Sequence, residues 1–362
     1  MKSFSFLPSI GLLLLPALFM SRPSAQTDKE DSHRLQALTV DCGSAKGMER
    51  IICLAEAFKA TLAADQVATL QRTYSKTDAT KWSNFPEFAE RPRRVGIRLG
   101  SLSEGQLKAA KALLAAAMTQ GVPNEGFDEL EGNLAADEYL GKRIGKTETF
   151  NSGNYYLAYL GTPSLSGLWE LQFGGHHFAV ANTYKDGKLP GVTPSFRGVE
   201  PIAPVTVNGQ THQSMEQERA AFAEMLSSLS KPQQDAARLS ATFRDVLLGP
   251  GQDGQFPTAK QGLKVGELTA AQKKLVLKAI NLYVNDLDPV TVAPLLAAYT
   301  ADLANTYVAF SGSGTMSQAG DYVRIDGPRV WIEYSGQDSR DIPGTVHPHS
   351  VWRDRQTDYG GN

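Results

Sequence analysis

Residues 168–184 read LWELQFGGHHFAVANTY, and this stretch decides the fold class of the chain. Aromatic and β-branched side chains predominate in it, as they do in β-strands. Residues 154–164, NYYLAYLGTPS, have the same character just before it, and residues 185–188, KDGK, supply a turn just after it. We therefore predict three strands, connected by turns, between residues 154 and 200.

The C-terminal part of the chain has the same character in residues 306–314 (TYVAFSGSG), 321–334 (DYVRIDGPRVWIEY) and 345–354 (TVHPHSVWRD). Asp326-Gly327-Pro328 marks a hairpin turn. Helical patterns lie between the two strand-rich parts, in residues 215–306. The sequence therefore predicts an α+β fold, in which an antiparallel or mixed sheet takes strands from both halves of the chain and is flanked by helices.

Three predicted helices begin with similar pentapeptides: Leu102-Ser103-Glu104-Gly105-Gln106, Leu229-Ser230-Lys231-Pro232-Gln233 and Leu268-Thr269-Ala270-Ala271-Gln272. In each, Ser or Thr at the N-cap accepts a hydrogen bond from the backbone three residues on, and the Gln there reaches back to the N-cap amide. The intervals of 127 and 39 residues share no period, so we interpret these as independent helix starts rather than a solenoid repeat. Another amphipathic helix is predicted from Met48 to about Leu70.

The composition excludes several classes of protein. The chain has 362 residues, of which 41% are hydrophobic and 20% are charged, so disorder is excluded as its main state. At about 150 residues per domain, this length corresponds to roughly two domains. The 36 basic and 38 acidic side chains give a net charge of -2, which provides no broad basic surface for nucleic acid or anionic lipid. We expect a small-molecule, glycan or peptide ligand, and no nucleic acid.

The first 25 residues have the pattern of a signal peptide. Lys2 precedes an apolar run from Phe4 to Met20, and the small residues Ser24 and Ala25 precede Gln26. We predict cleavage near Ala25, which leaves an exported protein, periplasmic or secreted, with a flexible leader over residues 26–40. An uncleaved N-terminal anchor is the alternative. No later apolar run is long enough to span a membrane, so no span is expected after cleavage.

Export bears on the two cysteines, Cys42 and Cys53. In an oxidising compartment, two cysteines separated by ten residues most simply form one disulfide bond. The alternative is a pair of buried thiols on a helical face.

Four of the six histidines occupy two tight groups, His176-His177 and His347-Pro348-His349. Side chains at positions i and i+2 of a strand share a face, so His347 and His349 can converge on one ion. Large apolar residues change phase across Gly174-Gly175, and we interpret this as a β-bulge that makes both His176 and His177 available. Such imidazoles suit a transition metal, with zinc the first choice and copper or iron as alternatives. A metal-free pocket, in which these histidines act as acid, base or oxyanion donor, and a purely structural network both remain open.

Three further residues are candidates for catalysis. Asp354 is a candidate to orient a ligating imidazole, and Arg353 to hold a substrate carboxylate or phosphate. These two residues also fit an ordinary surface ion pair. Glu200 is the carboxylate nearest the histidine pair in sequence, which makes it a candidate ligand or general base.

Several common reaction classes lack their motifs here. The sequence contains no H-E-x-x-H helix, G-x-S-x-G elbow, Walker loop or G-x-G-x-x-G after a strand. These absences argue against common metalloproteases, α/β-hydrolases, nucleotidases and dinucleotide enzymes.

Several stretches together resemble an exported family known as domain of unknown function 3500. They are Gly161 to Ser164, Trp169 to His177, Thr193 to Pro201, His347 to Gly360, the Trp82-Ser83-Asn84 loop and the helix start from Leu102 to Leu114. The resemblance covers most of the chain from about residue 45 to residue 361. It implies secretion, a single α+β domain over residues 41–362 and a site around the paired histidines, and it implies no reaction.

Two functions of different classes follow. The first is an exported metal-dependent hydrolase or oxidoreductase that uses the histidines as ligands. The second is a periplasmic or extracellular ligand-binding protein without catalysis, with a pocket walled by aromatic residues, namely Trp82, Tyr155, Tyr156, Trp169, Trp331 and Trp352.

Overall fold

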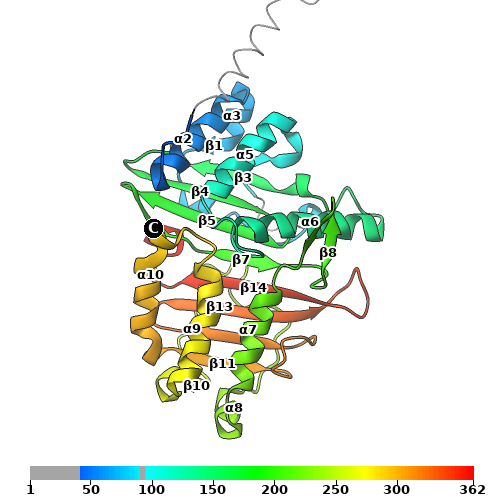
Figure 1. Cartoon of the computed structure of the whole chain (residues 1–362), viewed down its shortest axis with the longest axis vertical. Helices are drawn as coiled ribbons and strands as arrows, with labels where there is room; N and C mark the ends of the chain where they lie inside the picture. Colours follow the sequence, from blue (N-terminus) through cyan, green and yellow to red (C-terminus); the bar gives the residue numbers. More distant parts are fainter. Residues whose placement is uncertain (1–40, 90–93) are drawn as a thin grey trace, which may run out of the picture.

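The computed structural model describes residues 41–89 and 94–362, so the predicted signal peptide and the predicted leader lie outside the described residues. One mixed sheet of 12 strands runs through the molecule, in the order β1-β3-β4-β5-β7-β14-β13-β12-β11-β10, with β2 beside β3 and β6 beside β5. Helices lie across one face of this sheet (Figure 1). The predicted α+β class, with strands from both halves of the chain, is confirmed.

The strands of this sheet are β1 (Gln71–Arg72), β2 (Ile97–Arg98), β3 (Tyr156–Leu160), β4 (Leu168–Gly175), β5 (Phe178–Lys185), β6 (Lys188–Gly191), β7 (Ser195–Gly198), β10 (Leu263–Lys264), β11 (Tyr307–Ser311), β12 (Tyr322–Asp326), β13 (Val330–Asp338) and β14 (Val346–Asp354). A separate hairpin consists of β8 (Val205–Val207) and β9 (Gln210–His212).

The α-helices are α2 (Gly47–Ala60), α3 (Ala64–Leu70), α4 (Lys76–Ala79), α5 (Glu104–Ala116), α6 (Phe127–Ile144), α7 (Glu216–Ser227), α8 (Lys231–Ala237), α9 (Ala270–Val284) and α10 (Pro289–Asp302). The described residues also contain short 3₁₀ turns: η1 (Glu87–Ala89), η2 (Leu99–Ser101), η3 (Ser152–Asn154), η4 (Val265–Glu267), η5 (Leu303–Asn305) and η6 (Asp358–Gly361). The single helix predicted from Met48 to about Leu70 is two helices, because the chain leaves the helical conformation at Ala63 between α2 and α3.

The sheet consists of two copies of one structural unit. From the centre outward, β7, β5, β4 and β3 are matched by β14, β13, β12 and β11. β2 pairs antiparallel with β3 as β10 does with β11. β1 pairs parallel with β3, and Arg238 makes a parallel bridge to Phe310 at the equivalent place. The two units meet at β7 and β14, which are antiparallel neighbours in the middle of the sheet.

The helix starts follow the same duplication. The Gln106 carboxamide donates to Thr61 O (2.9 Å) and Gln66 (3.1 Å). In the second unit, the Gln272 carboxamide donates to Ser228 O (2.8 Å) and to Gln233 (2.9 Å). Helices α5 and α9 are therefore equivalent, and so are α3 and α8. The three helix starts are therefore not independent, which corrects our interpretation. The first unit has a fourth equivalent start at α3, and the pentapeptide pattern missed it because its N-cap is Ala63 rather than Ser or Thr.

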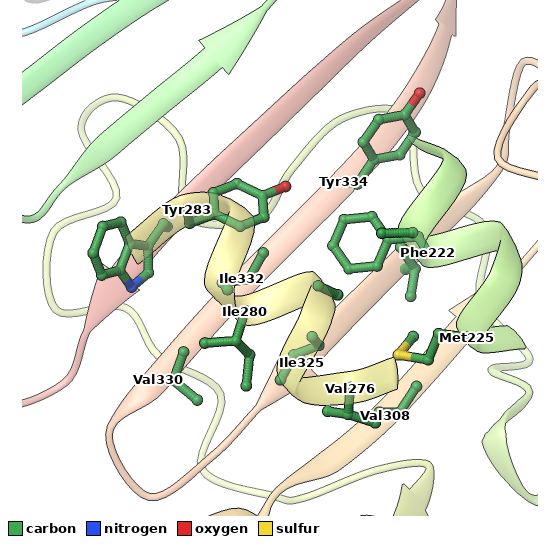
Figure 2. Packing of buried hydrophobic residues seen from close by; sticks show 14 of the residues in the cluster. Phe222, Met225, Val276, Ile280, Tyr283, Val308, Ile325, Val330, Ile332 and Tyr334 are labelled. Atoms are coloured by element: carbon green, nitrogen blue, oxygen red, sulfur yellow. The ribbon is translucent and has the colours of Figure 1, made fainter. Parts of the chain in front are cut away.

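The core of the second unit forms where α7 and α9 pack on the sheet. Figure 2 shows Phe222 and Met225 of α7 and Ile280 of α9 against apolar side chains of the strands. Alternate residues of β13 supply this surface, namely Val330, Ile332 and Tyr334. Residues i and i+2 of a strand share a face, so Trp331 lies on the other side of the sheet, in a different cluster.

Loops, the short helix α4 and the 3₁₀ turn η6 cover that opposite face. Ala79 of α4, Tyr359 of η6, and the loop residues Trp82, Leu248 and Phe256 pack in one cluster with Trp331. The Glu333 carboxylate of β13 accepts hydrogen bonds from the backbone N–H groups of Leu247 (2.7 Å) and Leu248 (2.9 Å). These bonds hold the loop that contains Leu248 against the sheet. With both faces covered, the central strands are buried along most of their length.

Two observations bear on the expectations about export. Cys42 and Cys53 form a disulfide bond, as predicted. Within the described part of the chain, no helix is long and apolar enough to cross a membrane.

Loss of the disulfide should lower the stability of the protein. The double change Cys42→Ser, Cys53→Ser should lower the free energy of unfolding by about 2–3 kcal/mol, because the bond closes a short loop in the unfolded chain. Urea unfolding of both proteins, followed by circular dichroism, measures the difference. Alkylation of unfolded, unreduced wild-type protein should modify no cysteine. Equal midpoints for the two proteins, or two alkylated thiols, would contradict the prediction.

Candidate metal centre

His176 and His177 are the two residues of the turn between β4 and β5. Gly174 pairs with Ala179 and Gly175 with Phe178, so the glycines lie in regular register. The predicted β-bulge is therefore wrong. Residues directly opposite in a hairpin share a face, so a two-residue turn by itself produces the phase change seen across the glycines. His177 adopts a left-handed conformation with φ of 64°, which helps to reverse the chain direction.

His347 and His349 project from one face of β14, as the i, i+2 rule predicts. Their Nε2 atoms lie 3.0 Å apart. His349 pairs with Gly198 of β7, and the Gly198 N–H donates to His177 O at 2.7 Å. The central pairing of the sheet thereby brings the turn histidines to the start of β14, across about 170 residues of sequence.

The ligand atoms of His177, His347 and His349 all lie within 4.8 Å of one another. The ring centroid of His177 is 5.0 Å from that of His347 and 5.1 Å from that of His349. His176 stacks on His177 with a centroid distance of 3.6 Å, so all four histidines form one cluster. His347 is half-buried while the other three are buried, which makes His347 the side from which solvent reaches the cluster.

Two aspartates hold the outer rings. His176 Nδ1 lies 2.7 Å from Asp137 Oδ1 of α6, and His349 Nδ1 lies 2.9 Å from Asp245 Oδ1. A carboxylate only accepts hydrogen bonds, so the Nδ1–H of each ring is directed to its aspartate, and Nε2 is the ring nitrogen on the other side. This carboxylate–imidazole arrangement is the usual support of histidine ligands in metal sites.

The other two imidazoles are kept neutral by their surroundings. Burial holds the pKa of His177 well below its usual range, and the three neighbouring imidazoles lower it further. Burial and the adjacent His349 lower the pKa of His347 in the same way. A neutral imidazole is the form that binds a metal, so the cluster offers lone pairs near neutral pH.

Glu200 lies at the edge of the cluster. Its carboxylate accepts a hydrogen bond from the Ser339 hydroxyl, and His176 and His349 both act on it electrostatically. Burial raises the pKa of Glu200, and the Ser339 hydrogen bond lowers it again in part. Of the three residues predicted to be catalytic, Glu200 is the one that the fold brings to the histidines.

Arg353 and Asp354 belong to other networks farther along β14. Arg353 donates to Leu248 O (3.1 Å) and to Asp253 (2.8 Å), so it anchors the loop that also carries Asp245. Asp354 accepts from the Tyr299 hydroxyl at 2.9 Å and pairs with Arg329 at 3.2 Å. Both side chains are thus engaged with protein partners away from the histidines. These contacts do not test a catalytic role, so the roles of Arg353 and Asp354 stay predictions.

Comparison with known proteins places the chain in a family. A family model described as "Protein of unknown function (DUF3500)" matches residues 44–361. The chain belongs to the DUF3500 family. No curated protein and no solved structure matches the chain.

Two residues of this DUF3500 protein escaped the sequence analysis. Asp137 precedes His176 by 39 residues, and Asp245 precedes His349 by 104, so neither is near its histidine in sequence. A signal for Asp137 existed. Glu129, Asn133 and Asp137 recur every four residues and form a polar stripe on α6, a helix that otherwise buries leucines and alanines. No comparable pattern marks Asp245, which lies in an irregular loop.

The donor set of the DUF3500 site fits a transition metal. Three imidazoles converge, and a second group of Asp137, His176 and His177 adjoins them. Edges of about 3.3 Å separate ligands in a tetrahedral site with metal–nitrogen bonds of about 2.0 Å, close to the observed His347–His349 spacing. Imidazole suits zinc, copper and iron, and carboxylates held in the outer layer suit all three.

A side chain at position 198 would disturb the histidine cluster. A Cβ atom there would lie 2.9 Å from His349 Cδ2, 3.0 Å from Pro348 O and 3.2 Å from His177 Cδ2. Gly198→Ala should therefore displace two of the three converging rings and weaken zinc affinity by about 10–100-fold, the range for disturbed ligand support. Competition with a chromophoric chelator measures the affinity.

Gly249→Ala is the matched control, since its Cβ would meet Val246 Cγ2 at 3.5 Å, an ordinary contact. Unchanged zinc affinity in Gly198→Ala would show that these rings are not the ligands.

Proposed function

We propose that this protein is an exported metal-dependent enzyme, and first of all a zinc hydrolase. The observation that carries the proposal is the convergence of His177, His347 and His349, with ligand atoms within 4.8 Å of one another. His176 supports this set from the adjacent position of the turn, as a further ligand or as a neighbour. Three histidine ligands with one open position are typical of catalytic zinc rather than structural zinc.

Bound zinc would lower the pKa of a water ligand to about 7 and so supply a nucleophile near neutral pH. The surrounding residues have separable roles in such a reaction. Asp137 and Asp245 orient two of the imidazoles through Nδ1. Glu200 is close enough to interact with two of the histidines and has a raised pKa, which suits a general base that accepts and returns a proton. With copper or iron in place of zinc, the same ligands would favour an oxidoreductase.

Export rests on two kinds of support. The N-terminal sequence has the signal-peptide pattern, and the Cys42–Cys53 disulfide is typical of an oxidising compartment. Either a periplasmic or a secreted location satisfies both.

The alternative, ligand binding without catalysis, has less support. The aromatic walls proposed for its pocket include Trp82, Tyr155, Trp169, Trp331 and Trp352, which are buried in the core. These side chains are 3% exposed or less, so other protein atoms surround them and they do not line an open pocket for a ligand.

Metal content tests the proposal. Protein purified without a histidine tag should carry close to one transition metal per chain by elemental mass spectrometry. His347→Ala, His349→Ala should abolish that metal and leave the far-UV circular dichroism spectrum largely intact. His33→Ala, in the predicted leader, is the control and should keep the full complement.

Stoichiometric metal in the double variant would refute the site. So would wild-type protein that takes up no metal after incubation with zinc, copper and iron, and that result would favour the metal-free pocket.

A second measurement asks whether one coordination position is open. Cobalt(II) in place of zinc gives a visible spectrum that depends on its ligands, and azide should change this spectrum by entering the open position. Glu200→Gln should keep the cobalt spectrum and the azide response, because Glu200 handles protons in the proposal. A spectrum insensitive to azide would indicate a closed, structural site and would contradict the enzyme assignment.

A further inference from the structure

A groove with a volume of about 1000 Å³ lies at the end of the sheet opposite the histidine cluster. β5 begins directly after His177 and ends at Lys185, and the turn that follows it borders the groove. A strand of eight residues spans about 25 Å, so the groove and the cluster are separate places. The other walls come from the start of α2, the end of α5 and α10, and Figure 1 shows α2 and α10 on the left side of the molecule. The groove therefore lies where the first structural unit meets the second.

Apolar side chains form most of the surface of this groove. Ile51 and Met118 line it and are buried, so they form its floor. Leu295 of α10 is half-buried on its wall, and Val122 is 38% exposed at its rim. Large apolar side chains that face water in a concave place mark the position of an apolar ligand, and the volume is at the upper end of the range of ligand pockets.

The charged residues that line the groove are mainly basic. Arg50, Lys188 and Arg329 line it together with one carboxylate, Asp288. That carboxylate is engaged as the N-cap of α10, because it accepts the Thr291 N–H at 2.9 Å and the Thr291 hydroxyl at 2.6 Å. The net charge of the lining is therefore +2, on a surface that is otherwise largely apolar.

The three basic side chains can each take a further partner. Lys188 is exposed and has no hydrogen bond or ion pair with the described residues. Arg50 reaches only the carbonyl of Cys42 within the described chain, at a long 3.4 Å. Arg329 pairs with Asp354 at 3.2 Å through Nη2, but its Nε is buried and has no partner among the described residues.

This combination selects a molecule with a long apolar body and an anionic end. Each methylene group that is removed from water improves affinity about fourfold. Arginine and lysine donate strong charge-assisted hydrogen bonds to a carboxylate, which would fix the orientation of the chain. A cationic amphiphile of the same length would meet repulsion from the same residues.

We propose that the groove binds one long-chain carboxylate, with its alkyl chain on Ile51 and Met118 and its carboxylate among Arg50, Lys188 and Arg329. The bound chain contacts the helices of the first unit and α10 of the second, and so bridges the two units. The site goes beyond the proposed enzyme, since no residue of the histidine cluster lines the groove.

Isothermal titration calorimetry of the purified protein with sodium dodecanoate tests the proposal. We expect one dodecanoate per chain with a dissociation constant of about 0.1 mM or below. Octanoate, which is shorter by four methylene groups, should bind at least about 20-fold more weakly. Dodecyltrimethylammonium, which has the same chain and the opposite charge, should bind at least about tenfold more weakly.

Three variants locate the bound molecule. Lys188→Glu should weaken dodecanoate binding at least about tenfold, because it places a negative charge beside the carboxylate. Lys108→Glu is the matched control and should leave the affinity unchanged, because Lys108 is exposed on α5 and does not line the groove. A carboxylate also binds to metal ions, so His347→Ala, His349→Ala should be measured too. Unchanged dodecanoate binding in this variant separates the groove from the proposed metal centre.

Several results would overturn the proposal. They are no saturable binding at 10 times the expected dissociation constant, equal affinity in Lys188→Glu, loss of binding in the histidine variant, and equal affinity for the cationic amphiphile. Protein that binds no dodecanoate but sediments with phosphatidylglycerol vesicles would assign the groove to a lipid surface instead. A dimer that Lys188→Glu dissociates would assign it to a second copy of the chain.

Discussion

The pairing of β7 with β14 is the contact on which the candidate site depends. Gly198 of β7 faces His349 across this pair, and its N–H holds the carbonyl of His177. One residue without a side chain thus sets the distance between the turn of the first unit and the strand of the second. Because backbone hydrogen bonds fix this distance to a few tenths of an ångström, the imidazoles are held in place before any ligand arrives.

The duplication of the sheet explains why the site lies where it does. In the second unit, the turn equivalent to His176-His177 joins β12 to β13 and contains Pro328 and Arg329. That end of the sheet holds the Arg329–Asp354 ion pair instead of imidazoles. The two ends of the central strand pair have therefore acquired different chemistry on one backbone plan. Functional residues are free to diverge in this way because the scaffold, not the turn, carries the stability.

Much of this arrangement was predictable because it depends on local sequence. The i, i+2 spacing placed His347 and His349 on one face, the cysteine spacing indicated the disulfide, and the capping residues marked helix starts. Other features depend on partners distant in the chain. Asp137 and Asp245 reach their histidines only through the fold. The phase change at Gly174-Gly175 was compatible with a bulge or a two-residue turn, and only strand pairing distinguishes them. The sequence did not reveal the duplication, because a buried strand position accepts several different apolar residues. Equivalent positions of the two units are therefore both apolar without carrying the same residue.

In the proposed centre, His177, His347 and His349 bind one metal ion together. X-ray absorption spectroscopy of the purified, metal-loaded protein at the zinc edge tests it most directly. We expect nitrogen or oxygen ligands at about 2.0–2.1 Å, with the outer-shell scattering of about three imidazole rings. A spectrum without imidazole scattering, or one with sulfur at about 2.3 Å, would contradict this ligand set.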